Sequence, residues 1–254
     1  TLPVLAIYRW HSLRKRVLKK DPSINKVLRE EKEDIEIAGF LAASLAWGQR
    51  PTIIKKCKEL MQLMDYAPHD FVMQAEDQDY ERFCNFKHRT FNSYDCVYFL
   101  KSLANIYRHH GGLETVFTRA YQKHQDMFEV LKEWYSVFTS LPAEARVLRH
   151  IANVEKGSAA KRVNMFLRWM VRHDGEVDFG LWKEIPTSAL VIPLDLHTGN
   201  VSRQLGLLTR NQNDRKAVEE LTARLREMDP VDPIRYDFSL FGLGAFEKYN
   251  RSNF

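Results

Sequence analysis

Residues 156–172 read KGSAAKRVNMFLRWMVR and residues 192–207 read IPLDLHTGNVSRQLGL. The first stretch begins with a glycine-serine turn, and Ser158 suits the N-cap position of the helix that follows. This helix carries Lys161 in its first turn. Its apolar side chains recur three or four residues apart and form the stripe expected to face a core, namely Ala160, Val163, Leu167, Met170 and Val171.

Two interpretations of Lys161 are open. It can be a solvated surface lysine, or a nucleophile of the kind that forms a Schiff base. The positive end of the helix dipole disfavours an ammonium at a helix start, which makes the neutral amine more available. In the second stretch, Asp195 can cap a helix, as Thr198 can, or it can stabilise a developing cation. Because the two side chains occur at successive helix starts, the pattern favours an active site that joins them.

The rest of the chain is predicted to be α-helical. With 254 residues, of which 44% are hydrophobic, the chain can bury a large core. Its apolar residues follow helical rather than alternating periodicity. We expect a cap at Ser93 and helices over residues 3–20, 34–47, 51–64, 93–110, 113–141 (in two pieces) and 142–153.

A short loop between two of these helices holds Trp47, Gln49 and Arg50. An aromatic ring, an amide and a guanidinium can contact nucleic acid, but the same loop can be an ordinary helical connection. The formal charge of +5 is compatible with nucleic acid without requiring it.

Cofactors and metals are not expected. The three cysteines, Cys57, Cys84 and Cys96, exclude a four-cysteine iron–sulfur cluster and argue against a disulfide framework or a zinc site. His109 and His110 are adjacent on a predicted helix, so they do not share a face that could hold a metal. The sequence has neither a membrane-spanning run nor a signal-peptide pattern, so we expect a cytoplasmic protein.

At this point the motifs resemble a known superfamily. Gly157-Ser158-Ala159-Ala160-Lys161, followed by Pro193-Leu194-Asp195-Leu196-His197, is similar to the motif of helix-hairpin-helix DNA glycosylases, and especially of 8-oxoguanine glycosylases. The segments at 40–61 and 237–246 resemble that superfamily's lesion-facing helix pair and closing helix. The inserted segment at 173–190 resembles the longer spacing of the archaeal type. Residues 156–172 are also similar to a bacterial family catalogued as a domain of unknown function.

The resemblance implies an all-α, two-lobed fold in which residues 1–254 form one glycosylase-like unit, with its motifs at about 156–207. It implies a monomeric DNA-repair enzyme that flips a damaged purine out of double-stranded DNA and excises it. Lys161 would attack the sugar, and Asp195 would stabilise the developing charge. The DNA contacts would come from Gly157, Ser158, Ala159, Arg162, His197, Trp47, Gln49 and Arg50, and the base pocket would include Trp182 and Phe246.

Two other classes of function remain open. The chain can be a non-catalytic nucleic-acid-binding protein in which Asp195 is only a cap, or a helical interaction protein that binds no nucleic acid. A pocket joining Lys161 to Asp195 would favour the enzyme. A cleft filled by side chains would favour the binding protein, and an acidic face over the hairpin would favour the interaction protein.

Overall fold

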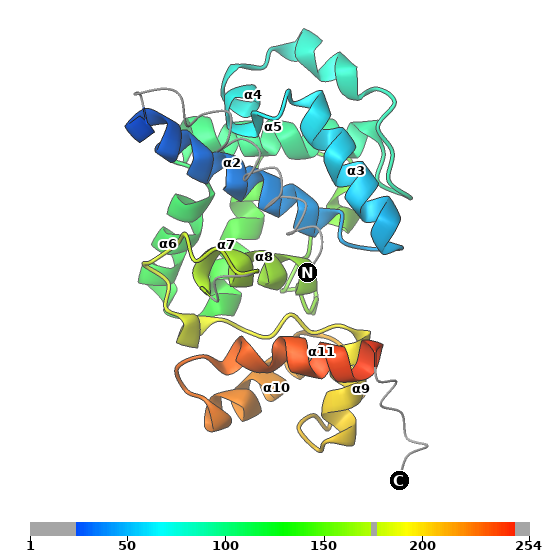
Figure 1. Cartoon of the computed structure of the whole chain (residues 1–254), viewed down its shortest axis with the longest axis vertical. Helices are drawn as coiled ribbons and strands as arrows, with labels where there is room; N and C mark the ends of the chain where they lie inside the picture. The colour runs from blue at the N-terminus through cyan, green and yellow to red at the C-terminus, as the bar shows by residue number, and fades with distance from the viewer. Residues whose placement is uncertain (1–23, 174–176, 247–254) are drawn as a thin grey trace. The chain divides into compact units, whose positions relative to one another are not determined.

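The computed structural model describes residues 24–173 and 177–246, with side chains from residue 32 onward, and its secondary structure is helical (Figure 1). These residues contain no β-strand, and only two isolated bridges, His88–Phe91 and His173–Phe179, pair in the manner of strands. The all-α prediction is therefore confirmed. The helix expected at residues 3–20 lies outside the described residues.

The chain divides into two compact units. Among the described residues, unit 1 comprises 24–119, 134–151 and Val177, and unit 2 comprises 120–133, 152–173 and 178–246. Helices α6 (Leu113–His124) and α7 (Met127–Phe138) each contribute to both units. The two helices expected between residues 113 and 141 are confirmed.

Unit 1 begins with α2 and α3, which match the two helices expected around the 47–50 loop. Gly48 has a φ of +101°, which glycine adopts without the penalty of a Cβ atom, and Pro51 lies in the first turn of α3. The remaining helical elements of this unit follow in chain order. The bounds are α2 Ile24–Ser44, α3 Arg50–Leu63, α4 Pro68–Gln74, the 3₁₀ helix η1 Asp77–Phe83, α5 Ser93–His109 and the 3₁₀ helix η2 Val147–His150.

The core of unit 1 is an aromatic cluster formed by α2, α5 and α7. Its members are Phe40, Phe99, Trp134 and Phe138, all of them buried. The ring of Phe138 lies 5.1–5.3 Å, centroid to centroid, from those of Phe40, Phe99 and Trp134. Such ring contacts add to the free energy gained from apolar burial.

Unit 2 contains the helices that carry the two motifs. Its elements are α8 Lys161–Val171, the 3₁₀ helix η3 Thr187–Ala189, α9 Leu196–Gln204, α10 Arg215–Met228, the 3₁₀ helix η4 Pro233–Tyr236 and α11 Asp237–Ala245. Figure 1 shows α11 alongside α9. Gly244 permits this approach, because a Cβ atom there would lie 3.0 Å from Cβ of His197 and 3.1 Å from Cγ2 of Val201. The predicted stripe of α8 is confirmed, since all five of its residues are buried.

Two local predictions in unit 1 are wrong. The segment 142–153 is not a helix but an irregular path with one 3₁₀ turn, held by tertiary contacts in which Arg146 and His150 both face the buried Asp95. The cap of α5 is Asn92 and not Ser93. Oδ1 of Asn92 accepts from the amide of Asp95 at 3.2 Å, and Oδ2 of Asp95 accepts from the amide of Asn92 at 2.9 Å.

Within the described residues, no helix combines the length and the apolar character that a membrane crossing requires.

Candidate lysine–aspartate site

The turn that precedes α8 is held by its own backbone and by one asparagine side chain. Oδ1 of Asn153 accepts hydrogen bonds from the amides of Glu155 and Lys156, at 2.9 and 3.1 Å. The amide of Gly157 donates to the carbonyl of Val154 at 3.1 Å. Gly157 has a φ of +82°, so the reversal uses a conformation that favours glycine.

Helix α8 starts without a capping side chain. Its N-cap residue is Ala160, in the left-handed region with φ 47° and ψ 33°. The prediction that Ser158 caps this helix is wrong, because Oγ of Ser158 accepts from the amide of Ala160 at 3.1 Å, one step before the helix begins. The first-turn N–H groups of α8, which begin at Lys161, therefore have no acceptor from an N-cap side chain. Such groups suit an anion.

Helix α9, in contrast, is capped by Asp195. Oδ1 of Asp195 accepts from the amide of Thr198 at 2.9 Å, so Asp195 rather than Thr198 is the cap. The main-chain carbonyl of Asp195 accepts from Nδ2 of Asn213 at 3.1 Å. Pro193 and Leu194, which precede the cap, are buried. The carboxylate is thus held by the local backbone and by the core beneath it.

The second carboxylate oxygen of Asp195 faces Lys161. Oδ2 lies 3.8 Å from Nζ, and the side chains of Lys161 and Asp195 are 33% and 19% exposed. One carboxylate therefore caps α9 with one oxygen and pairs with the lysine through the other. The pairing offsets the repulsion that the helix dipole exerts on an ammonium at the start of α8. Before Lys161 can act as a nucleophile, its ammonium must give up a proton.

Behind this pair lies a buried ion cluster centred on Arg168, whose side chain is 1% exposed. Its Nε and Nη2 donate to the carboxylate of Asp178 at 3.1–3.3 Å, and its Nη1 donates to Asp237 at 2.6 Å. Arg172 joins the cluster through Asp178 and Asp232, at 2.8 Å each. Arg168 does not belong to the apolar stripe of α8, so the helical period alone gives no reason to expect it in the core. The available signal was a single acid within each of two apolar stretches, VDF at 177–179 and DFSLF at 237–241.

Asp237 connects the ion cluster to the lysine–aspartate pair. Burial raises the pKa of the Asp237 carboxyl to about 6; Arg168 opposes this rise, Asp195 adds to it, and Lys161 opposes it. The electrostatic coupling places a second carboxyl group in the environment of the pair. From the sequence, Asp237 was expected only as the first residue of the closing helix, with no role at the site.

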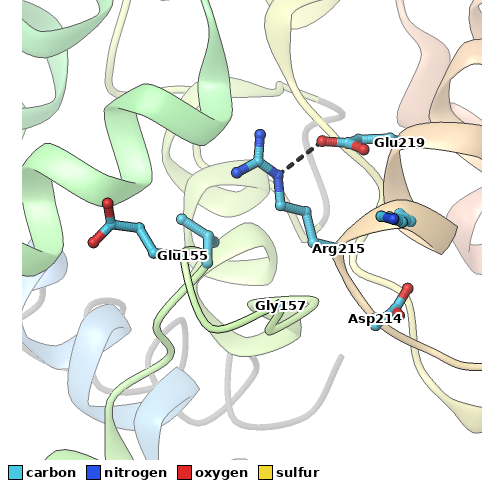
Figure 2. A pocket seen from close by; sticks show the side chains of 7 residues that line it. Glu155, Gly157, Asp214, Arg215 and Glu219 are labelled. Carbon is cyan, nitrogen blue, oxygen red and sulfur yellow. Dashed lines mark hydrogen bonds and ion pairs between the residues drawn. The ribbon is translucent and has the colours of Figure 1, made fainter.

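A cavity of about 360 Å³ lies beside the turn that precedes α8, at the start of α10 (Figure 2). We call this turn, residues 153–160, the hairpin. The amide of Arg215 donates to the carbonyl of Gly157 at 3.0 Å, which joins α10 to the hairpin. Figure 2 shows the Arg215 side chain directed at Glu219, which accepts from Nε at 2.8 Å. Lys161 and Asp195 do not line this cavity. Its lining residues are Val154, Glu155, Gly157, Asp214, Arg215, Lys216 and Glu219.

The acidic residues of the cavity already have cationic partners. Glu155 pairs with Lys132, Asp214 with Arg210, and Glu219 with Arg215. Within the described parts of the chain, the nearby Lys156 and Lys216 have no such partner, and both are exposed. The charge left available beside the hairpin is therefore positive.

The other predicted site residues of unit 2 occupy different surroundings. Arg162 follows Lys161 in α8, and partial burial lowers the pKa of its guanidinium. His197 is exposed, with its ring 5.6 Å from that of Phe241. Phe246 is 73% exposed, at the end of the described chain.

Trp182 lies in the core instead of on a pocket wall. It is 1% exposed and packs edge to face on Phe166, with 5.4 Å between ring centroids. Its amide also donates to the carbonyl of Met170 at 2.9 Å. Trp182 therefore has a packing role, and its side chain is not exposed for the predicted contact with a base.

Trp47, Gln49 and Arg50 belong to unit 1. Trp47 is half-buried, whereas Gln49 and Arg50 are exposed. Gln49 is the N-cap residue of α3, and its side chain makes no cap hydrogen bond. Both side chains that follow Gly48 are therefore free to contact a partner, and their nucleic-acid role stays a prediction.

No cluster of three or more His, Cys, Asp or Glu side chains suited to a metal occurs among the residues that the structure describes. Cys57 and Cys96 are buried and Cys84 is exposed, and all three are free thiols. Burial raises the pKa of the Cys57 thiol to about 12.

Comparison with known proteins identifies a family. The family model described as Protein of unknown function (DUF2400) matches residues 21–246, so the chain belongs to this family. The predicted resemblance to a family of unknown function is confirmed. Neither the curated proteins nor the solved structures gave a match.

Proposed function

We propose that this member of the DUF2400 family is a DNA glycosylase with lyase activity that excises a damaged purine of the 8-oxoguanine kind. The observation that carries the proposal is the 3.8 Å approach of Lys161 Nζ to Asp195 Oδ2, from the starts of two different helices. Its further support is the resemblance of the two motifs, in their order, to helix-hairpin-helix DNA glycosylases.

In the proposed reaction Asp195 accepts a proton from the Lys161 ammonium, and the free amine attacks C1′ of the damaged nucleotide. The bond from C1′ to the purine breaks, and its electron pair leaves with the base. Asp195 returns its proton to the departing base, and the carboxylate so restored opposes the positive charge on the sugar, as carboxylates do in glycosidic cleavage. The new C1′–Nζ amine loses a proton, its lone pair then forms the imine as the C1′–O4′ bond breaks, and O4′ takes up a proton as the sugar ring opens. Removal of a neighbouring sugar proton then expels the 3′ phosphate.

The surroundings of α8 supply the DNA contacts of this proposal. The uncapped amides at the helix start suit a phosphate, and so do the ammonium groups of Lys156 and Lys216, which have no ion-pair partner among the described residues. The target nucleotide has to be flipped, because a stacked base cannot be reached at C1′. His197 and Arg162 are the further candidates for contacts with the backbone.

The test is borohydride trapping of the imine. Duplexes carrying 8-oxoguanine or other damaged purines are incubated with the protein and borohydride, and we expect a covalent complex. Lys161→Gln should abolish this complex. Lys156→Gln is the matched control, because it removes one ammonium from the same hairpin without removing the proposed nucleophile. It should still trap at saturating DNA.

Asp195→Asn separates the two roles of the aspartate. Asparagine is also a good N-cap, so the amide can keep the hydrogen bond to Thr198 while the charge is lost. We expect normal melting, normal binding and trapping that is slower by at least about 100-fold. Trapping by Lys161→Gln at the rate of the parent protein, or no trapping by the parent on any lesion, would eliminate the lyase mechanism.

The second candidate is a non-catalytic nucleic-acid-binding protein, which is favoured by the cap hydrogen bond of Asp195. In that case the ion pair with Lys161 only positions two helix starts. Binding would fall with salt by a slope of about 0.9 per neutralised phosphate, and no variant would alter a covalent product.

A further inference from the structure

A tight turn in unit 1 holds an arginine in a conformation that arginine seldom adopts. His88 and Phe91 exchange backbone hydrogen bonds at 2.7 and 3.0 Å, which leaves Arg89 and Thr90 at the tip. Arg89 has a φ of +56°. Glycine, asparagine and aspartate are the residues favoured there, because a larger side chain is strained in the left-handed region. An arginine at this position breaks a local rule, which is typical of functional positions.

The arginine side chain lies over Trp47. The Arg89 guanidinium carbon is 5.2 Å from the centroid of the indole ring. Gly48 makes room for it, because a Cβ atom on that residue would lie 3.0 Å from both Cδ and Nη1 of Arg89. Nε2 of His88 lies 3.0 Å from the carbonyl of Trp47, so the turn and the 47–50 loop are joined. Nη2 of Arg146 also donates to the carbonyl of Thr90 at 3.3 Å, which joins the turn to the segment 142–153.

The cations at this surface are not neutralised. Arg50, Lys87 and Arg89 are exposed, and none of them has an ion pair within the described residues. Asp95, an acid that follows this turn in the sequence, is fully buried and already faces Arg146 and His150. The surface therefore presents a planar cation over an aromatic ring, with two further exposed cations at Arg50 and Lys87.

We propose that Arg89, held over Trp47, is a contact for an unstacked nucleobase, and that Arg50 and Lys87 contact the neighbouring phosphates. The inference rests on the proposed function only in taking DNA as the partner. A planar guanidinium offers both a stacking face and a charge, which is the combination used for unpaired nucleotides. The strained backbone at Arg89 then has a functional reason, since glycine would fit the turn but present neither feature.

The experiment compares two DNA probes by fluorescence anisotropy. One is a fully paired 20-mer duplex, and the other is the same duplex with one unpaired 2-aminopurine, whose own fluorescence reports stacking. Arg89→Gly should lower affinity for the bulged duplex about tenfold, and for the paired duplex only about two- to threefold. Arg89→Lys keeps the charge but not the plane. It should bind the paired duplex like the parent protein and the bulged duplex about fivefold more weakly, with less quenching of 2-aminopurine.

Melting of Arg89→Gly provides the folding control. Because glycine suits the backbone at position 89, this variant should melt within a few degrees of the parent protein. Equal losses on the two probes would reduce Arg89 to a simple phosphate contact and overturn the inference. So would affinities equal to those of the parent, or a parent protein that binds neither probe.

Borohydride trapping tests the proposed lyase function independently of the Arg89 contact. If the parent protein fails to trap any lesion but its affinity for the bulged duplex depends on Arg89, the lyase mechanism falls and the contact stands. If the parent traps a lesion and Arg89→Gly binds both probes normally, the contact falls and the mechanism stands.

Discussion

The aromatic cluster of unit 1 and the ion cluster of unit 2 both have buried centres, Phe138 and Arg168, but they are stabilised differently. The aromatic cluster gains its free energy from apolar burial and ring packing, which do not depend on protonation. The ion cluster sets two guanidinium groups against three carboxylates, those of Asp178, Asp232 and Asp237. Its stability depends on which carboxyl groups are ionised, and the excess of acid is compatible with a proton on Asp237.

The difference bears on function because the ion cluster is coupled to the candidate site. Asp237 interacts electrostatically with both Lys161 and Asp195. A change of charge in the cluster therefore alters the field at the proposed nucleophile. The aromatic cluster contains no titratable group and holds the unit 1 scaffold that carries the 47–50 loop.

The largest expected effect is in the aromatic cluster. Phe40→Ala should lower the free energy of unfolding by about 3–5 kcal/mol, because it removes ring contacts and leaves a cavity. The loss should be the same at pH 5 and pH 8. Thermal or urea unfolding measures it. A loss that changes strongly with pH would show that the cluster is not purely apolar in its energetics.

A smaller effect, which does depend on pH, is expected in the ion cluster. The pKa of Asp237 is about 6 in the folded protein and about 3.9 in an unfolded chain. Because the folded state holds the proton more tightly, this group favours folding at low pH, and its contribution is lost as the pH rises from about 4 to above 6. Asp237→Asn removes that titration.

The measurement is the difference in unfolding free energy between the parent protein and Asp237→Asn. From pH 4 to pH 7 the parent should lose about 1–3 kcal/mol relative to the variant. A difference that stays constant over this range would place the titration elsewhere. Phe40→Ala, measured over the same range, is the pH-insensitive control.

The smallest effect concerns a helix start in unit 1, away from both clusters. Asn92→Ala should cost about 1 kcal/mol, because it removes the cap of α5. Ser93→Ala is the matched control and should change stability by less than about 0.5 kcal/mol. Chemical denaturation of the two variants measures the two losses in unfolding free energy. Equal losses would mean that the cap contributes no more than an ordinary first-turn side chain.

Several features of the fold followed from local pattern. The stripe of α8 was predicted correctly, because the helical period marks a buried face directly in the sequence. The helix pair around the 47–50 loop followed from Gly48 and Pro51, which act through backbone conformation. The N-cap position of α8 was wrongly assigned to Ser158, because the Ser158 hydroxyl is used within the turn and Ala160, in the left-handed conformation, precedes the helix.

Other features depended on distant contacts. The segment 142–153 has a helical composition, but Arg146 and His150 pair with Asp95, and these interactions outweigh local propensity. Trp182 was expected in a base pocket and is instead buried against Phe166. An aromatic residue in an irregular segment carries no local signal that distinguishes a wall of a pocket from a core.

By itself the sequence determined the helical class, most helix positions, and the occurrence of Lys161 and Asp195 at two successive helix starts, because periodicity and turn residues act over a few neighbours. Only the tertiary structure brought Lys161 Nζ to within 3.8 Å of Asp195, buried Arg168 between two carboxylates, and laid Arg89 over Trp47. These arrangements join residues 10 to 69 positions apart. Coulombic and stacking energies depend on distance in space, which the spacing of residues along a chain does not specify.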